Sequence, residues 1–183
     1  MARGRAMWKG HLRLSLVSIP VELYNAVESA ASISFNQIHK PSGRRINYTK
    51  TVAGIGEIKP EDIVKGYAVS KDTLVLIEPE EIEALRVESR KTIELREFVD
   101  LEQIDARYFE RPYYLVPQDD EGAAEGYLVI REALKRAGKA GLGQVTIGGR
   151  EHLVAIAPVG RGLVVEMLRY ASEVRPERSY FGD

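Results

Sequence analysis

Near the start of the chain, the stretch His11-Leu12-Arg13-Leu14-Ser15-Leu16 alternates polar and apolar residues. A period of two is typical of a strand that turns one face to a core and the other to solvent. Similar alternation recurs over residues 33–36 and 91–99. These three stretches predict a protein whose fold is mainly β.

Further strands are predicted where short apolar runs lie between glycine-rich or proline-containing turns. Pro20 is expected to interrupt the chain before the second strand, and the run at 74–77 is expected to be a buried strand. The predicted strands beyond those above span residues 21–27, 74–77, 113–116, 142–147, 153–156 and 163–168. About eight or nine short strands with a few helices indicate a barrel or a sandwich.

Residues 123–137 form the clearest helix of the sequence, ending at Gly138. Leu128, Ala133 and Leu134 are expected to face the core. Two shorter helices are predicted from their first residues: Pro79 suits the first turn of one, and Asp100 with Gln103 resembles a capping box.

A length of 183 residues allows one substantial core or at most two small ones, and 44% hydrophobic and 29% charged residues are ordinary for a soluble globular protein. No apolar run reaches the roughly 20 residues of a membrane-spanning helix. The basic start is not followed by the uncharged apolar stretch of a secretory signal, which is therefore not expected. There is no cysteine, which excludes disulfides and thiolate metal sites. A cytoplasmic protein without membrane contact is therefore expected.

Charge is unevenly distributed although the net charge is only −1. Residues 1–50 hold eight basic against two acidic residues, whereas residues 51–110 hold eight against fifteen. One reading is a surface that attracts an anion beside one that repels it. The other is two ordinary solvated faces, and composition leaves both open.

Residues 45–66 predict a long arm or loop that leaves the main body, because Gly54, Gly56 and Pro60 break any period. Cations gather on this segment and on the turn before it: Lys40, Arg44, Arg45, Lys50, Lys59 and Lys65, with Tyr48 among them. Flexible cations on an arm suit phosphates, since backbone contacts need no base recognition. A solubilised loop remains the alternative.

Two further basic positions lie in the second half of the chain. Arg131, Lys135 and Lys139 share a helix face beside Arg136, where a solvated surface is the favoured reading. Arg150 follows the Gly148-Gly149 turn, a position that could hold a guanidinium rigidly.

The sequence predicts no enzyme active site. The three histidines, His11, His39 and His152, lie far apart without carboxylates at metal-ligand spacing, and no GxxxxGK[ST] phosphate loop is present. Glu78, Glu80, Glu81, Glu83 and Glu88 are better explained as a solvated face than as catalytic carboxylates. We therefore expect no catalytic residue, no metal and no cofactor.

Six motifs, in order along nearly the whole chain, resemble bacterial Ku. They are Trp8-Lys9-Gly10 with Leu16-Val17-Ser18-Ile19-Pro20-Val21-Glu22-Leu23-Tyr24; Phe35-Asn36-Gln37-Ile38-His39-Lys40; Ile63-Val64-Lys65-Gly66-Tyr67; Arg111-Pro112-Tyr113-Tyr114-Leu115-Val116-Pro117; Gly149-Arg150-Glu151-His152-Leu153-Val154-Ala155; and Leu168-Arg169-Tyr170.

The resemblance implies a single Ku core domain over residues 1–183: a Ku-type β-barrel core with a long arm, including residues 40–66, that bridges over DNA. It also implies a ring-shaped homodimer that binds double-stranded DNA ends in non-homologous end joining and recruits or stimulates a repair DNA ligase. Such a protein is cytoplasmic and joins the nucleoid when bound to DNA. The implied DNA contacts are the basic residues of the arm and Arg150.

Two departures from the family accompany this resemblance. Many relatives carry a pair of cysteines in the arm where this chain has Thr51 to Gly56, so a metal-stapled arm is not expected. The usual C-terminal extension beyond Asp183 is expected to be absent, which puts ligase recruitment in doubt.

Two rival functions stay open at this stage. A barrel for single-stranded nucleic acid would need aromatic residues among the cations, and only Tyr48 fits. A minor abasic-site lyase would need a lysine of lowered pKa, which no feature of the sequence identifies.

Overall fold

The computed structural model describes residues 4–28, 35–71, 73–85 and 91–182. The chain divides into two units. We call Met1–Glu28 together with Val87–Asp183 the barrel unit, and Ser29–Arg86 the arm unit.

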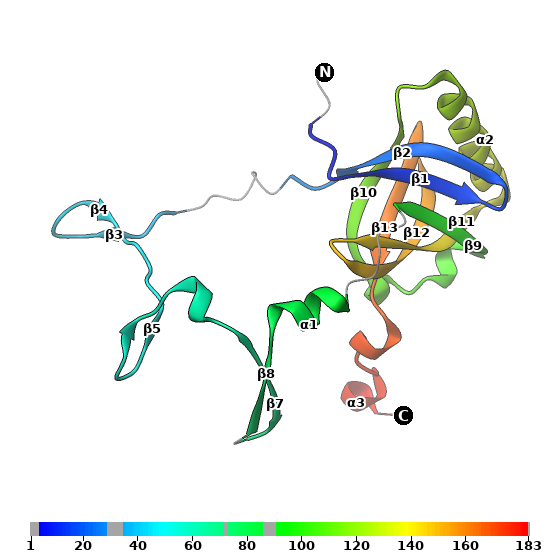
Figure 1. Cartoon of the computed structure of the whole chain (residues 1–183). Coiled ribbons are helices and arrows are strands. Elements are labelled where there is room, and N and C mark those ends of the chain that lie inside the picture. Colours follow the sequence, from blue (N-terminus) through cyan, green and yellow to red (C-terminus); the bar gives the residue numbers. More distant parts are fainter. Residues whose placement is uncertain (1–3, 29–34, 72, 86–90, 183) are drawn as a thin grey trace. The chain divides into compact units, whose positions relative to one another are not determined.

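Within the described residues, seven strands of the barrel unit close into a barrel in the order β1-β2-β10-β13-β12-β11-β9 (Figure 1). Neighbouring strands pair antiparallel except β1 and β9, which run parallel and complete the closure. The mainly β fold and the barrel are thereby confirmed. The strands are β1 (Trp8–Leu14), β2 (Val17–Asn25), β9 (Thr92–Asp100), β10 (Phe109–Pro117), β11 (Lys139–Ile147), β12 (Arg150–Val159) and β13 (Gly162–Leu168).

The interior of the barrel is filled by alternate residues of its strands, as the period of two predicts. Along β13, Leu163, Val165 and Met167 are buried while the residues between them are partly exposed. Leu12 of β1 and Ile93 of β9 are fully buried. Because each such side chain stabilises the fold by about 1.5–3 kcal/mol, these inward positions dominate the stability of the unit.

The helix α2 (Glu121–Ala137) lies against the barrel (Figure 1). The side chain of Asp120 accepts a hydrogen bond from the backbone N–H of Ala123 at 3.2 Å, and Gly138 ends the helix at φ 66°. Ala123, Tyr127, Ile130 and Leu134 form its buried stripe. Leu134 is therefore confirmed as a core residue.

The prediction was wrong for Leu128 and Ala133, both of which are exposed. Leu128 is 47% exposed. The stripe at i, i+4, i+7 and i+11 is set by Ala123 and Tyr127, whose small or partly polar side chains concealed it in the sequence.

The first hairpin differs from expectation at two residues. Leu16 was predicted inside a half-buried strand, but it lies in the turn after Ser15 (φ 53°) and is 97% exposed. Pro20 does not interrupt the chain, because it lies within β2 opposite His11. Its carbonyl accepts from Gln118 N at 3.0 Å, and the carbonyl of Gln118 accepts from Asp120 N at 2.7 Å, so neither group needs the N–H that Pro20 lacks.

The arm unit consists of short hairpins and short helices. Its elements are β3 (Ile38–His39), β4 (Arg44–Arg45), β5 (Thr51–Val52), β6 (Gly56–Glu57), the 3-10 helix η2 (Pro60–Asp62), β7 (Lys65–Ser70), β8 (Thr73–Ile77) and α1 (Pro79–Ala84). Among its described residues none is buried; Ile58, Ile77 and Ile82 are half-buried and the others are exposed. The described part of the unit therefore has no core of its own.

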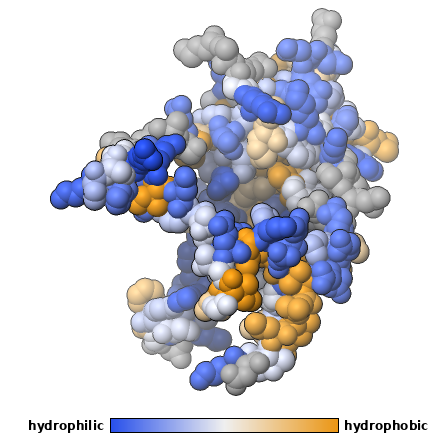
Figure 2. Space-filling view, turned by 60° about the vertical axis from the view of Figure 1, so that its left-hand side comes forward, coloured by the Kyte–Doolittle hydropathy of each residue, from blue (hydrophilic) through white to orange (hydrophobic). Residues whose placement is uncertain are grey.

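Two strand predictions in the arm unit were wrong in part. The 74–77 strand exists as β8, but Leu74, Val75 and Leu76 are exposed rather than buried. For the predicted strand 33–36, positions 33 and 34 lie outside the described residues, and Phe35 and Asn36 are not in a strand. Figure 2, in which orange marks hydrophobic residues, shows that hydrophobic side chains lie on the molecular surface.

The short helices begin as predicted. Pro79 occupies the first turn of α1, and Asp100 forms a capping box with Gln103 of η3 (Leu101–Gln103). The remaining short helices are η4 (Ala106–Tyr108), η5 (Ala171–Glu173) and α3 (Arg178–Phe181). All three belong to the barrel unit.

Candidate nucleic-acid interface

Three of the predicted DNA-binding residues lie on one small hairpin, which we call the basic hairpin (Ile38–Arg45). It pairs β3 with β4, so that His39 lies opposite Arg44 and Ile38 opposite Arg45. Gly43 N donates to the carbonyl of His39 at 2.8 Å with φ 64°, a left-handed conformation that favours glycine. The turn therefore places Lys40, Arg44 and Arg45 on one short hairpin.

Residues just outside the hairpin hold it closed. Arg45 donates to the side-chain carbonyl of Asn36, and the hydroxyl of Tyr48 donates to that of Gln37. Ile46 N donates to the carbonyl of Gln37 at 3.0 Å. The motif Asn36-Gln37 thus has a structural role that sequence reasoning did not assign.

The hairpin keeps its positive charge. Lys40 and Arg44 are exposed and make no ion pair with any residue that the structure describes. The partner of Arg45 is a neutral amide, and the sequence holds no acidic residue between Glu28 and Glu57. A polyanion therefore meets exposed cations here with no neighbouring carboxylate in the chain to repel it.

The other predicted cations of the arm unit are spread along it. Lys50 precedes the β5–β6 hairpin, and its carbonyl accepts from Ile58 N at 3.0 Å. Lys65 begins β7 opposite Ile77. Lys59 lies 3.5 Å from the carboxylate of Glu61, and both side chains are exposed. Its charge is therefore partly neutralised, which weakens the argument for a phosphate contact at this position.

In the barrel unit, Arg150 opens β12 after the turn at Gly148 and Gly149 and is exposed. It forms no ion pair within the described part of the chain. Two residues of the basic helix face that the sequence predicted form ion pairs: Arg131 pairs with Glu132, and Lys139 pairs with Asp100 at 2.8 Å. The reading of that face as solvated surface holds for Lys135 and Arg136, which are exposed. It was wrong for Arg131, whose side chain is only 15% exposed, and for Lys139, which begins β11 and is not part of the helix.

Ionisable groups with shifted pKa lie elsewhere in the barrel unit. Arg107 donates to both carboxylate oxygens of Asp105, at 2.9 and 2.8 Å, and lowers the pKa of that carboxyl to about 2. Burial raises the pKa of Glu166 on β13. Neither group is among the candidate DNA contacts.

Two other kinds of site are absent from the residues that the structure describes. Over 4–28, 35–71, 73–85 and 91–182, no three His, Asp or Glu side chains are grouped so that they could hold a metal ion. In the same ranges, no helix is both long and apolar enough to span a bilayer.

Residues 13–181 match the family model described as the Ku70/Ku80 beta-barrel domain. A non-homologous end joining protein Ku of Acidobacterium capsulatum is 42% identical over 182 residues, covering 97% of this chain and 59% of that relative. The protein of the same description from Bradyrhizobium sp. (strain ORS 278) is 41% identical, covering 98% and 61%. The one from Archaeoglobus fulgidus is 37% identical, covering 93% and 67%.

The chain thus spans about three fifths of the length of the first two relatives. The family match extends over both units, since residues 13–181 include the whole arm unit and all the barrel strands except the first five residues of β1. The barrel of the structure agrees with the fold that the family model describes. The chain belongs to the Ku family.

Proposed function

We propose that this protein binds the ends of double-stranded DNA without regard to sequence, as a ring-shaped homodimer in repair by non-homologous end joining. The observation that carries the proposal is the basic hairpin: exposed, unpaired cations on a segment free of acidic residues, in a chain of the Ku family. The curated relatives are named for non-homologous end joining.

Binding would act through the phosphate backbone. Lys40, Arg44 and Arg45 offer charges to phosphates, and neutralising a phosphate releases condensed counterions. Such contacts fix position but read no bases, so affinity is independent of sequence. Lys50, Lys59, Lys65 and Arg150 are further contacts of this proposal, with Lys59 the weakest because Glu61 lies beside it.

The lack of a core in the described part of the arm unit supports a role that involves partners. Short two-stranded hairpins are marginally stable by themselves, because they bury too little to offset the entropy of ordering. DNA on the cationic residues and a second copy against the apolar ones would supply that burial. We therefore propose that residues 40–66 belong to an arm that bridges over the duplex.

In this proposal preference for ends is topological. A closed ring can be threaded only onto a free end, so binding needs no catalytic chemistry, and we propose that the protein is not an enzyme. It would act on nucleoid DNA in the cytoplasm and hold ends for a DNA ligase, which it recruits or stimulates.

The first experiment is a competition gel shift with a labelled linear duplex. Unlabelled linear DNA should compete, whereas a relaxed covalently closed circle of the same sequence should compete poorly. The mass of the free protein, measured by light scattering, should be that of two chains. Equal competition by the circle, or a single chain in solution, would refute the ring.

The second experiment tests the basic hairpin with Arg44→Ala/Arg45→Ala. Each phosphate contact contributes about 0.9 to the slope of log K against log salt, so the slope should fall by about two for one arm and about four for a ring with two arms. Lys135→Ala/Arg136→Ala removes the same charge from adjacent exposed residues of α2 and should leave the slope unchanged. Equal effects of the two variants would show that the contacts are misassigned.

A further inference from the structure

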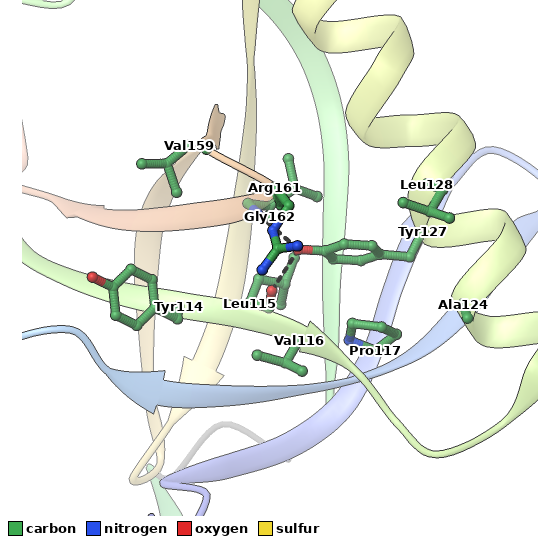
Figure 3. Close-up of a pocket in the computed structure, with 12 residues that line it drawn as sticks. Tyr114, Leu115, Val116, Pro117, Ala124, Tyr127, Leu128, Val159, Arg161 and Gly162 are labelled. Carbon is green, nitrogen blue, oxygen red and sulfur yellow. Dashed lines mark hydrogen bonds between the residues drawn. The ribbon is translucent and has the colours of Figure 1, made fainter. Parts of the chain in front are cut away.

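The barrel unit contains a hollow of about 600 Å³ between the end of β10, the β12–β13 turn and α2 (Figure 3). Its volume falls within the range of about 300–1,000 Å³ that is typical of ligand sites. Its position is independent of the basic hairpin, because all of its lining residues belong to the barrel unit.

The floor of the hollow is fixed by Tyr127. Its hydroxyl donates to the carbonyl of Leu115 and accepts from the backbone N–H of Leu163, both at 2.7 Å (Figure 3). The ring is 4% exposed, so this side chain joins α2 to β10 and β13 from inside. The hollow is therefore held open by rigid elements and would bind a ligand with little loss of loop entropy.

The rim carries large apolar side chains that lack a cover. Tyr114, Leu128 and Val159 come from three different elements, and they are 49%, 47% and 45% exposed. One exposed apolar residue is ordinary, but three around a single hollow form the kind of patch that marks an interaction site.

One cation lies among these apolar groups. Arg161, in the β12–β13 turn, lines the hollow, is exposed and makes no ion pair with any residue in the described part of the chain. Figure 3 shows Arg161 among the residues that line the hollow. A planar guanidinium binds a carboxylate through two parallel hydrogen bonds and is weakly hydrated, so it suits a partly apolar rim.

These features specify the ligand. A large apolar or aromatic side chain would fill the space between Tyr114, Leu128 and Val159, and a carboxylate one or two residues away would reach Arg161. A DNA backbone is disfavoured, because the hollow offers a single cation among apolar walls.

We propose that this hollow is a docking site for a short peptide segment of a partner protein, which inserts an apolar side chain between α2 and β10 and pairs a carboxylate with Arg161. The site is separate from the DNA contacts and does not depend on them. The exposed aromatic and apolar rim supplies the affinity, and the charge of Arg161 selects a carboxylate over an amide.

The test uses fluorescein-labelled hexapeptides in a glycine-serine background, with Leu, Phe or Trp at the third position and Glu at the fourth or fifth. Matched peptides carry Gln in place of Glu. Fluorescence anisotropy should show that wild-type protein binds at least one Glu peptide at least tenfold more tightly than its Gln partner.

Arg161→Gln should remove that tenfold preference, and Leu128→Asp should reduce binding of all the peptides at least tenfold. Val129→Asp is the matched control, because Val129 is the next residue of α2, is 69% exposed and lines a different groove. It should bind like the wild type. Thermal melts of the three variants, each altered at an exposed position, should agree with the wild type.

Several outcomes would overturn the proposal. They are failure of all Glu peptides to bind, equal binding of Glu and Gln peptides, and variants at Arg161 and Leu128 that bind like the wild type. A peptide with the sequence of this chain's own residues 78–85 is also tested. Binding of that peptide in preference to the others would assign the hollow to a second copy, and loss of DNA affinity in Arg161→Gln without peptide binding would assign it to nucleic acid.

Discussion

Tyr127→Phe removes one oxygen atom from the interior of the barrel unit and keeps the shape of the ring. In the structure that oxygen joins two backbone groups, the N–H of Leu163 and the C=O of Leu115, which otherwise belong to paired strands. Burial also raises the pKa of Tyr127, which favours the protonated hydroxyl that donates to Leu115.

The magnitude follows from the two groups that lose their partner. A buried donor or acceptor left without a hydrogen bond costs about 1–3 kcal/mol. The carbonyl retains a second lone pair, so we take the lower part of the range for it and expect a loss of about 2–4 kcal/mol in the free energy of unfolding. At about 3 °C per kcal/mol for a unit of this size, Tm should fall by roughly 6–12 °C.

Urea unfolding followed by circular dichroism measures the difference, with Tyr114→Phe as the control. Tyr114 is 49% exposed and its hydroxyl makes no hydrogen bond within the described residues, so its loss should change stability by less than about 0.5 kcal/mol. An equal m-value in both variants would confirm that only the native state has changed. A Tyr127→Phe protein as stable as the control would refute the assignment of the hydroxyl as the tie between α2 and the strands.

Three further predictions concern the barrel unit. Gly143→Ala places a Cβ 2.4 Å from the backbone oxygen of Glu94, so β9 and β11 must move apart, and the free energy of unfolding in urea should fall by about 1–3 kcal/mol. Gly66→Ala is the control, because the nearest atom to its Cβ is 3.9 Å away, and it should cause no such loss. Asp105→Asn should lower the urea midpoint at pH 7. Because the pKa of Asp105 is lowered to about 2, the ionised carboxylate stabilises the folded state above the ordinary pKa of 3.8, and this stabilisation is lost as pH falls through about 2. The difference in urea midpoint between Asp105→Asn and wild type should therefore disappear over that pH range. Glu166→Gln should raise the urea midpoint at pH 7 and not below pH 4.5. Burial raises the pKa of Glu166, so the folded state favours the protonated carboxyl, and the stability of the wild type falls as pH rises above the ordinary pKa of 4.5. An equal gain in urea midpoint at both pH values would contradict this.

The strands of the barrel could be predicted because their burial is local information. In β1 the polar residues His11 and Arg13 are exposed and Leu12 between them is buried, and no distant contact is needed to see that period. The end of α2 was equally predictable, because Gly138 adopts the left-handed conformation that glycine favours. Which face of α2 is buried was not predictable, because Tyr127 carries a polar hydroxyl and is nevertheless buried, with that hydroxyl bonded to the backbone of two strands.

The candidate site was predicted in part, because a cluster of cations, like the burial pattern of a strand, is local information. The density of cations between Lys40 and Lys50 is visible in the sequence, and the structure brings Lys40, Arg44 and Arg45 onto one hairpin. The bonds from Arg45 to Asn36 and from Tyr48 to Gln37 join residues nine and eleven positions apart, which no periodicity announces. Ion pairs such as Lys59 with Glu61 depend on side-chain conformation and were missed as well.

The strand β8 shows most sharply what local patterns leave undecided, because its apolar run predicted burial and the structure exposes it. In the β7–β8 register, Tyr67 lies opposite Val75 on one face, and Ala68 lies opposite Leu74 on the other. Apolar residues thus lie on both faces of a hairpin that has no third strand among the described residues. Such a pattern is typical of a strand covered on both sides, so the sequence of this hairpin matches an environment that the described part of the arm unit does not supply. In the proposed homodimer a second copy would supply it, and the order of the basic hairpin, in the same unit, would then depend on assembly as well as on DNA.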